Sequence, residues 1–515
     1  MSVTMRFRVA DAINVAALAV LFAALILPLS FTGGVATTPA IGQSLGGSAL
    51  ALAWLTNGFM LTFGGSLLAA GVMADKLGRK RVFTGGLLLF FLSCLAVCVA
   101  GSTVAIGALR AVQGIAAAMT LAGGSAMLAQ LFSGPARTRV FGILGTMFGA
   151  GLAFGPPIAG VVIEQFGWRW LYALLGLLAG LSALTGAVFL PASRKPAGKR
   201  ADVPGLALFS ACLVFFTMAL LLIPQYGIVS GPVITLLLAT LAAAKAFVAR
   251  CRRAAQPVLE LALLRDARFA GVLLLPLATC CCYVVWLILL PLRFTGADAL
   301  SATASGLYML ALTLPVLLLP GVAAMLTRWI GAGHLAASGL VIAAVGLALL
   351  GQALQGGSVP LLMTALVITG TGSALPWGLM DGLAVSGVPV EKAGMAAGLF
   401  NTVRVAGEGV ALVGVMAFLA AANQHTLAAT GYPAQAIARA AEWLGNGHLQ
   451  QAQSLLPDAP RALLYHSLNH AYLLLCNLLA LLTLLCAAIV WKTLRGREGS
   501  PPLTDAAPRR PEESP

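Results

Sequence analysis

The sequence predicts an all-α, polytopic membrane protein. Of its 515 residues, 60% are hydrophobic and only 9% are charged, whereas soluble domains carry about 25% charged residues. Apolar runs of about 20 residues, long enough to cross a bilayer, recur fourteen times. Short polar turns separate them, and such turns cannot lie in hydrocarbon. These observations place most of the chain in a membrane.

Positive charges orient the predicted spans. Most of the 31 Lys and Arg residues fall on the side that holds both termini; the four on the opposite side are Arg169, Arg293, Arg439 and Arg461. Cytoplasmic loops carry the excess of Lys and Arg, so we expect a cell-membrane protein with both termini cytoplasmic. The first apolar run is too long for a cleaved signal peptide. The predicted spans cover residues 12–37, 50–72, 82–101, 104–131, 140–163, 168–190, 204–224, 230–249, 269–292, 303–326, 335–354, 359–385, 393–420 and 465–491.

The spans group into two bundles of six with an insert between them. Residues 1–190 are predicted to form the N-terminal bundle and residues 269–495 the C-terminal bundle, which includes an outer loop at 421–464. Residues 191–268 hold a basic linker, two inserted spans and an amphipathic segment expected on the inner membrane surface. Residues 496–515 are rich in Pro and charge and are predicted to be disordered.

A charged turn between the second and third spans, Gly71-Val-Met-Ala-Asp-Lys-Leu-Gly-Arg-Lys-Arg81, is the most informative motif. Its glycines permit a tight reversal, and its basic residues keep the turn in the cytoplasm. The pattern resembles the signature loop of the major facilitator superfamily. The resemblance implies a fold of two six-helix bundles, with the loop latching one half against the other during alternating access. The candidate latch residues are Gly71, Asp75, Gly78, Arg79 and Lys80.

The corresponding segment of the second half is less complete. Gly321–Gly331 lies where a repeat of the loop is expected, and it has an arginine but no aspartate. We therefore expect a lopsided latch, in which Asp75 and Arg79 carry most of the gating.

The fourth span contains a buried arginine in an RxxQG pattern formed by Arg110, Gln113 and Gly114. A charge at this depth is costly and is expected to have a functional or structural partner. In the superfamily that this motif resembles, the arginine is implicated in proton transfer. The alternative is a hydrogen bonder that pins helices together.

The fifth span carries a glycine-proline motif, with Gly151, Gly155, Pro156 and Gly160 as its candidate functional residues. Small residues let helices pack closely, and proline kinks a helix. The motif resembles the antiporter motif of exporters. Together with fourteen spans, it is similar to the larger drug:proton antiporter family, in which residues 204–249 would be the two inserted helices.

The position of the coupling carboxyl departs from that family. Ser30 stands where the family places an aspartate in the first span, and serine cannot carry the proton. Glu164, Asp381 and Glu408 are the acids left at membrane depth. We hypothesise that Glu408, or else Asp381, replaces the lost acid. The alternative for Glu408 is a permanent salt bridge to Arg404, four residues earlier on the same helical face.

The predicted function is export of small amphipathic or toxic compounds by proton antiport. The expected partners are a small-molecule substrate, protons and the lipid bilayer, and a monomer is expected. Trp54, Asn57 and Trp377 are candidate cavity residues, with ordinary packing as the alternative. Rival interpretations are a facilitator or importer of a metabolite, which Ser30 favours, and a membrane sensor on the same fold.

Other functional classes are not supported by the sequence. Its basic residues lie in short clusters between apolar runs and not on a soluble face, which argues against nucleic-acid binding. No GxxxxGK[ST] motif occurs, so ATP-driven transport is not indicated. The cysteines lack metal-site spacing, and His466 and His470 have no third ligand in view. We expect no cofactor, no metal and no enzymatic activity.

Overall fold

The computed structural model describes residues 3–47, 49–132, 134–191, 202–227, 229–254, 264–356, 358–386, 393–428 and 431–495. Within these ranges the chain is helical and contains no strand. Fourteen helical segments are long and apolar enough to cross a membrane, which confirms the predicted number of spans. The basic linker at 194–200, residues 258–263 of the predicted amphipathic segment and the tail at 496–515 lie outside the described residues.

The N-terminal half is a bundle of six helices. They are α1 (Val3–Leu45), α2 (Ala49–Leu77), α3 (Arg79–Val99), α4 (Thr103–Leu131), α5 (Gly134–Phe166) and α6 (Trp168–Phe189). Helix α2 packs along α4, α1 along α5, and α3 along α4 and α6. Glycines make the close approaches possible: a side chain on Gly86 of α3 would lie 2.8 Å from the backbone nitrogen of Thr120 in α4.

The C-terminal half also contains six spans. The first of them consists of α9 (Ala267–Thr279), a π-helical turn η2 (Cys280–Val284) and α10 (Val285–Gly296). The others are α11 (Ala302–Leu326), α12 (Ala332–Gly356), α13 (Val359–Ser386), α14 (Ala393–Leu427) and α17 (Arg461–Thr493). Helix α12 packs against α13 and α17, and α11 packs against α13.

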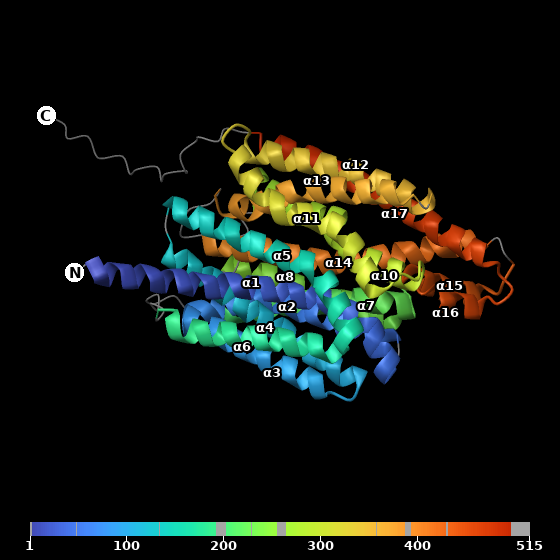
Figure 1. Cartoon of the computed structure of the whole chain (residues 1–515), viewed down its shortest axis with the longest axis horizontal. Helices are drawn as coiled ribbons and strands as arrows, with labels where there is room; N and C mark the ends of the chain where they lie inside the picture. Colours follow the sequence, from blue (N-terminus) through green and yellow to red (C-terminus); the bar gives the residue numbers. More distant parts are fainter. Residues whose placement is uncertain are drawn as a thin grey trace.

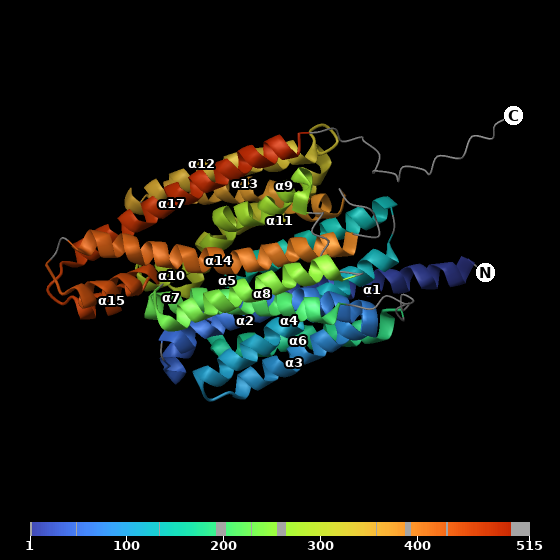
Figure 2. The same ribbon diagram turned by 180° about the vertical axis from the view of Figure 1, so that it is seen from behind.

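Two inserted helices, α7 (Val203–Tyr226) and α8 (Gly231–Arg253), lie along the seam between the halves on the side seen in Figure 2. Helix α7 contacts both α2 and α14. Asp202 caps α7 by accepting a hydrogen bond from the Gly205 nitrogen at 3.1 Å, and it also accepts from Arg250 Nε of α8 at 2.8 Å. This shared carboxylate ties the beginning of α7 to the end of α8.

The loop that the sequence predicts on the outer side contains a helical hairpin of α15 (Ala434–Gly445) and α16 (Leu449–Leu455), called the outer hairpin below. This hairpin lies at the end of the molecule opposite the beginning of α1 and the end of α17 (Figure 1). Helix α14 extends to Leu427 and α17 begins at Arg461, so both are longer than their predicted spans. Apolar runs report only the part of a helix that faces hydrocarbon, whereas backbone hydrogen bonding continues beyond it.

Candidate functional site

Arg110 is the buried charge of the N-terminal half. It has no exposed surface, and its Nε donates to the Leu55 carbonyl at 3.0 Å. Nη1 donates to Gln113 Oε1 at 2.8 Å and to Ser30 Oγ at 3.3 Å. The guanidinium also lies 4.5 Å from the centre of the Phe59 ring, a cation–π contact. The structure therefore brings together Arg110, Gln113 and Ser30.

The Arg110 charge has only neutral hydrogen-bond partners among the described residues. Ser30 is fully buried and supplies a hydroxyl where a carboxylate would neutralise the guanidinium. Nη2 of Arg110 has no hydrogen-bond partner in the part of the chain that the structure describes. The Arg110 guanidinium therefore has no carboxylate hydrogen-bond partner among the described residues.

Arg404 of α14 pairs with Asp381 of α13. Its Nη2 donates to both carboxylate oxygens at 3.0 Å, and its guanidinium lies over the rings of Phe400 and Trp377 at 4.9 Å and 5.5 Å from their centres. The salt bridge between Arg404 and Glu408 considered from the sequence is therefore wrong in this structure. Helical spacing places Glu408 near Arg404, but the packing of α13 on α14 brings a better-aligned carboxylate.

Glu408 is left without such a partner. It is half-buried near the middle of α14, and no hydrogen bond or ion pair joins its carboxylate to any described residue. Helix α14 packs here against η2 and α9 of its own half and against α2 of the other half. Glu408 is thus an unpaired acid at membrane depth, close to the boundary between the halves.

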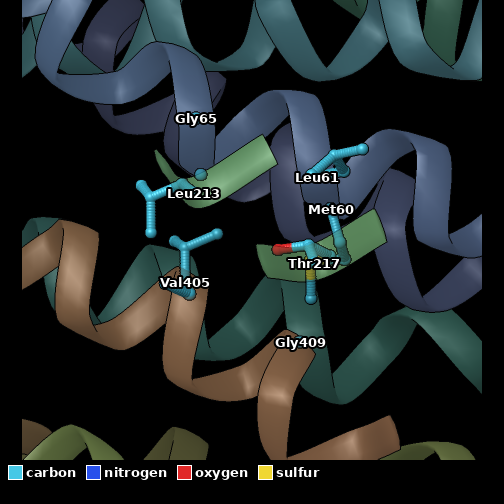
Figure 3. A pocket seen from close by; sticks show the side chains of 9 residues that line it. Met60, Leu61, Gly65, Leu213, Thr217, Val405 and Gly409 are labelled. Atoms are coloured by element: carbon cyan, nitrogen blue, oxygen red, sulfur yellow. The ribbon is translucent and has the colours of Figure 1, made fainter. Parts of the chain in front are cut away.

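A small cavity lies beside this position, between α2, α7 and α14 (Figure 3). Its volume is about 10 Å³, whereas drug-sized ligands occupy sites of about 300 Å³ or more. The seam is therefore closed at this level. The lining residues include Met60, Gly64, Leu213, Val405 and Gly409.

The candidate cavity residues differ in their burial. Trp377 is 2% exposed and packs edge-on against Tyr283, with ring centres 5.6 Å apart. Trp54 and Asn57 are half-buried on α2. In this closed arrangement Trp377 has the contacts of a packing residue.

Sequence reasoning missed the π-helical turn η2 that presents Tyr283. Pro276, four residues before η2, lies inside α9 and lacks the backbone N–H of a regular helical residue. Such turns often occur at functional sites. Pro276 was the available signal, but a proline alone does not distinguish a kink from a π-helical turn.

The charged turn between α2 and α3 makes its described contacts within the N-terminal half. Gly78 has φ 101°, a conformation that favours glycine. Arg79 Nη1 donates to the Ala126 carbonyl of α4 at 3.1 Å, and Lys80 Nζ donates to the Leu190 carbonyl after α6 at 2.6 Å. Helix α2 continues regularly through Gly71 and Asp75, and the side chain of Asp75 lies outside the described part. A latch to the other half stays a prediction.

The glycine-proline motif places α5 directly against α1. A Cβ on Gly151 would collide with the Leu25 carbonyl and lie 2.6 Å from Pro28 Cγ, and a Cβ on Gly155 would collide with the Thr32 hydroxyl. Pro156 lies within the same helix, and Gly160 is buried. These residues set the spacing between α1 and α5.

Gly151→Ala should therefore destabilise the protein by about 1–3 kcal/mol, because the Leu25 backbone cannot move without displacing α1. Thermal unfolding of the detergent-purified protein measures the effect. Gly145→Ala is the matched control on the same helix, because its Cβ would meet Asp381 only at 3.8 Å. Equal unfolding midpoints for the two variants would contradict this account.

Comparisons with known proteins agree with the geometry. The family model described as Major Facilitator Superfamily matches residues 20–412. The tetracenomycin C resistance and export protein of Streptomyces glaucescens is 27% identical over 407 residues, covering 78% of this chain and 75% of that protein. The probable actinorhodin transporter of Streptomyces coelicolor is 30% identical over 406 residues, covering 75% and 69% respectively.

Solved structures share the fold at low sequence identity. The human organic anion transporter MFSD10 superposes with a TM-score of 0.59 at 15% identity, covering 94% of this chain and 99% of that chain. A POT family transporter in complex with 5-aminolevulinic acid gives a TM-score of 0.62 at 14% identity, covering 93% and 96%.

Proposed function

Because the chain belongs to the Major Facilitator Superfamily, we propose that it exports small amphipathic or toxic compounds by proton antiport. Its relatives are resistance and export proteins, and the chain is a multi-pass membrane transporter rather than an enzyme. The two six-helix bundles would rock against each other around a central path and expose it to the two sides of the membrane alternately.

The observation that carries the proton-coupling part is the state of the intramembrane acids. Coupling needs a carboxyl group that gains and loses a proton at membrane depth. Asp381 is engaged by Arg404 at 3.0 Å, and Ser30 cannot titrate. Glu408 has neither of these limitations, which supports it as the coupling residue.

The membrane orientation and the assembly state belong to the same proposal. The beginning of α1 and the end of α17 lie at one end of the molecule (Figure 1), as an even number of spans requires. The basic loops at that end support a cytoplasmic location for it. We infer that a monomer transports, because each chain has both bundles and its own seam.

The test is proton-driven transport of candidate compounds in vesicles that contain the purified protein. A panel of tetracenomycin C, methylenomycin A and ethidium, chosen because the first two appear in relatives' names, is offered against an imposed pH gradient. We expect at least one compound to be transported against its concentration gradient, and a protonophore to abolish that transport. Vesicles without protein are the control.

A facilitator is the second candidate, favoured by the neutral Ser30 beside Arg110. It predicts equilibration of the compound at the same rate with and without a pH gradient. That outcome would overturn proton antiport while leaving the transport path in place.

A further inference from the structure

The corner between α10 and α11, residues 297–301, is a strained part of the outer surface. Ala299 has φ 54° and is the one non-glycine residue with positive φ among the residues that the structure describes. Such a conformation costs free energy and persists where its surroundings impose it. Here the nitrogens of Ala297 and Asp298 both donate to the Arg293 carbonyl, at 2.8 Å and 3.0 Å.

The outer hairpin of α15 and α16 and the beginning of α17 both contact this corner. The Tyr465 hydroxyl at the start of α17 donates to the Ala297 carbonyl. The backbone of Gly447, between α15 and α16, packs closely on Gly296. A side chain on Gly296 would collide with the Gly447 carbonyl. The corner is therefore in contact with both the hairpin and α17.

A buried arginine fixes the base of the corner. Arg293 is 3% exposed; its Nη2 donates to Asn469 Oδ1 at 2.6 Å, and its Nε lies 3.5 Å from Asp298 Oδ2. Burial raises the pKa of the Asp298 carboxyl, although the Arg293 charge acts to lower it. The carboxylate is thus held in a partly desolvated position within the corner.

Directly after the corner, the beginning of α11 is joined to the N-terminal half. Glu164, near the end of α5, accepts a hydrogen bond from the Thr303 nitrogen at 3.0 Å and another from the Thr303 hydroxyl. Thr303 lies in the first turn of α11, where a helix favours a negative charge. One turn further, a side chain on Gly306 would lie 2.7 Å from Pro157 Cα of α5. The hydrogen bonds between Glu164 and Thr303 thus lie next to the close apolar contact between Gly306 and Pro157, and both contacts join the two halves.

We propose that the α10–α11 corner is the outer gate of the transporter and that Glu164 is its latch. Opening the path to the outside requires α5 and α11 to separate at their outer ends, which breaks both hydrogen bonds to Thr303. The strained corner and the hairpin move as one body with α11 while Glu164 stays with α5. This proposal rests on the alternating access in the proposed function and adds the residues that close its outer side.

The test measures opening directly, with no need for a substrate. Thr313 is fully buried and lies seven residues after Gly306, on the same face of α11. Thr313→Cys is therefore a reporter that becomes accessible when the outer ends separate. A membrane-impermeant maleimide is added from the outside, and labelling is compared with that of the parent protein, which retains its nine native cysteines.

Glu164→Gln in this background should raise the labelling rate of Cys at position 313 roughly 3- to 10-fold, because the amide oxygen accepts a weaker hydrogen bond than the carboxylate does. Thr303→Val, which removes only the hydroxyl, should act in the same direction. The labelling rate of the double variant should be only slightly higher than that of Glu164→Gln, because both changes act on the same contact. Glu442→Gln is the matched control, an exposed carboxylate in the outer hairpin, and should leave the rate unchanged.

Labelling of both Glu164→Gln and Thr303→Val at the rate of the Glu442→Gln control would overturn the proposed gate. Unfolding midpoints equal to that of the parent protein would show that the variants are folded. The outcome is separable from the proposed function. Faster labelling in a protein that fails to move protons would support the latch and contradict antiport. Unchanged labelling in a protein that couples export to protons would do the reverse.

Discussion

Replacing Glu408 by glutamine should abolish proton-driven export while leaving the protein folded. Glutamine keeps the size and polarity of the side chain but cannot release a proton at any relevant pH. Since Glu408 has no ion pair or hydrogen bond with the described residues, its neutralisation breaks no such contact, although it removes a longer-range attraction to Arg404. We expect at least a tenfold loss of concentrative export, measured in vesicles with an imposed pH gradient.

The form of the loss distinguishes coupling from folding. Downhill movement of the same compound should continue in Glu408→Gln, because the path is intact, and it should no longer respond to the pH gradient. Glu408→Asp retains a titratable group and should restore part of the coupling. Undiminished proton-driven export by Glu408→Gln would show that the coupling group lies elsewhere.

Replacing Asp381 by asparagine should mainly reduce stability. Arg404 has an 8% exposed side chain and Asp381 a 29% exposed one, so the variant leaves a buried guanidinium without its carboxylate. Breaking one partner of a buried pair costs about 3–5 kcal/mol. We expect the free energy of unfolding to fall by about 3 kcal/mol, the lower end of this range, because Asp381 is partly exposed to water. The measurement is the thermal unfolding midpoint together with the yield of monodisperse protein.

A second substitution shows whether the unpaired charge is the cause. Arg404→Met fills a similar volume without charge, so the Asp381→Asn/Arg404→Met double variant should recover most of the lost stability. If the two single losses instead add in the double variant, the two residues do not act as a pair. The contrast with Glu408→Gln is useful, because one acid is assigned to coupling and the other to structure.

The sequence predicted the number of spans because bilayer thickness leaves a direct record in the length of apolar runs. It also predicted close helix packing along the fifth span from residues such as Gly151 and Pro156, whereas only the structure showed that α1 is the partner helix. It also predicted that Ser30 stands where the resembled family has a titratable aspartate, and this stays a prediction. These conclusions need only residue identity and spacing.

The partners of the charges needed the tertiary structure. Spacing on one helix offered Glu408 as an alternative partner of Arg404, yet Asp381, 23 residues away, takes that place because α13 packs on α14. The contact between Glu164 and Thr303 joins residues 139 positions apart and leaves no pattern in the sequence.

The physical reason is that helical periodicity reports neighbours only within a few residues. Which helices face each other depends on packing that is summed over their whole length. The sequence by itself therefore determined a fourteen-span transporter with few intramembrane charges. Only the folded chain decided which of those charges are paired, which acid has no hydrogen-bond or ion-pair partner among the described residues, and which residues join α5 to α11.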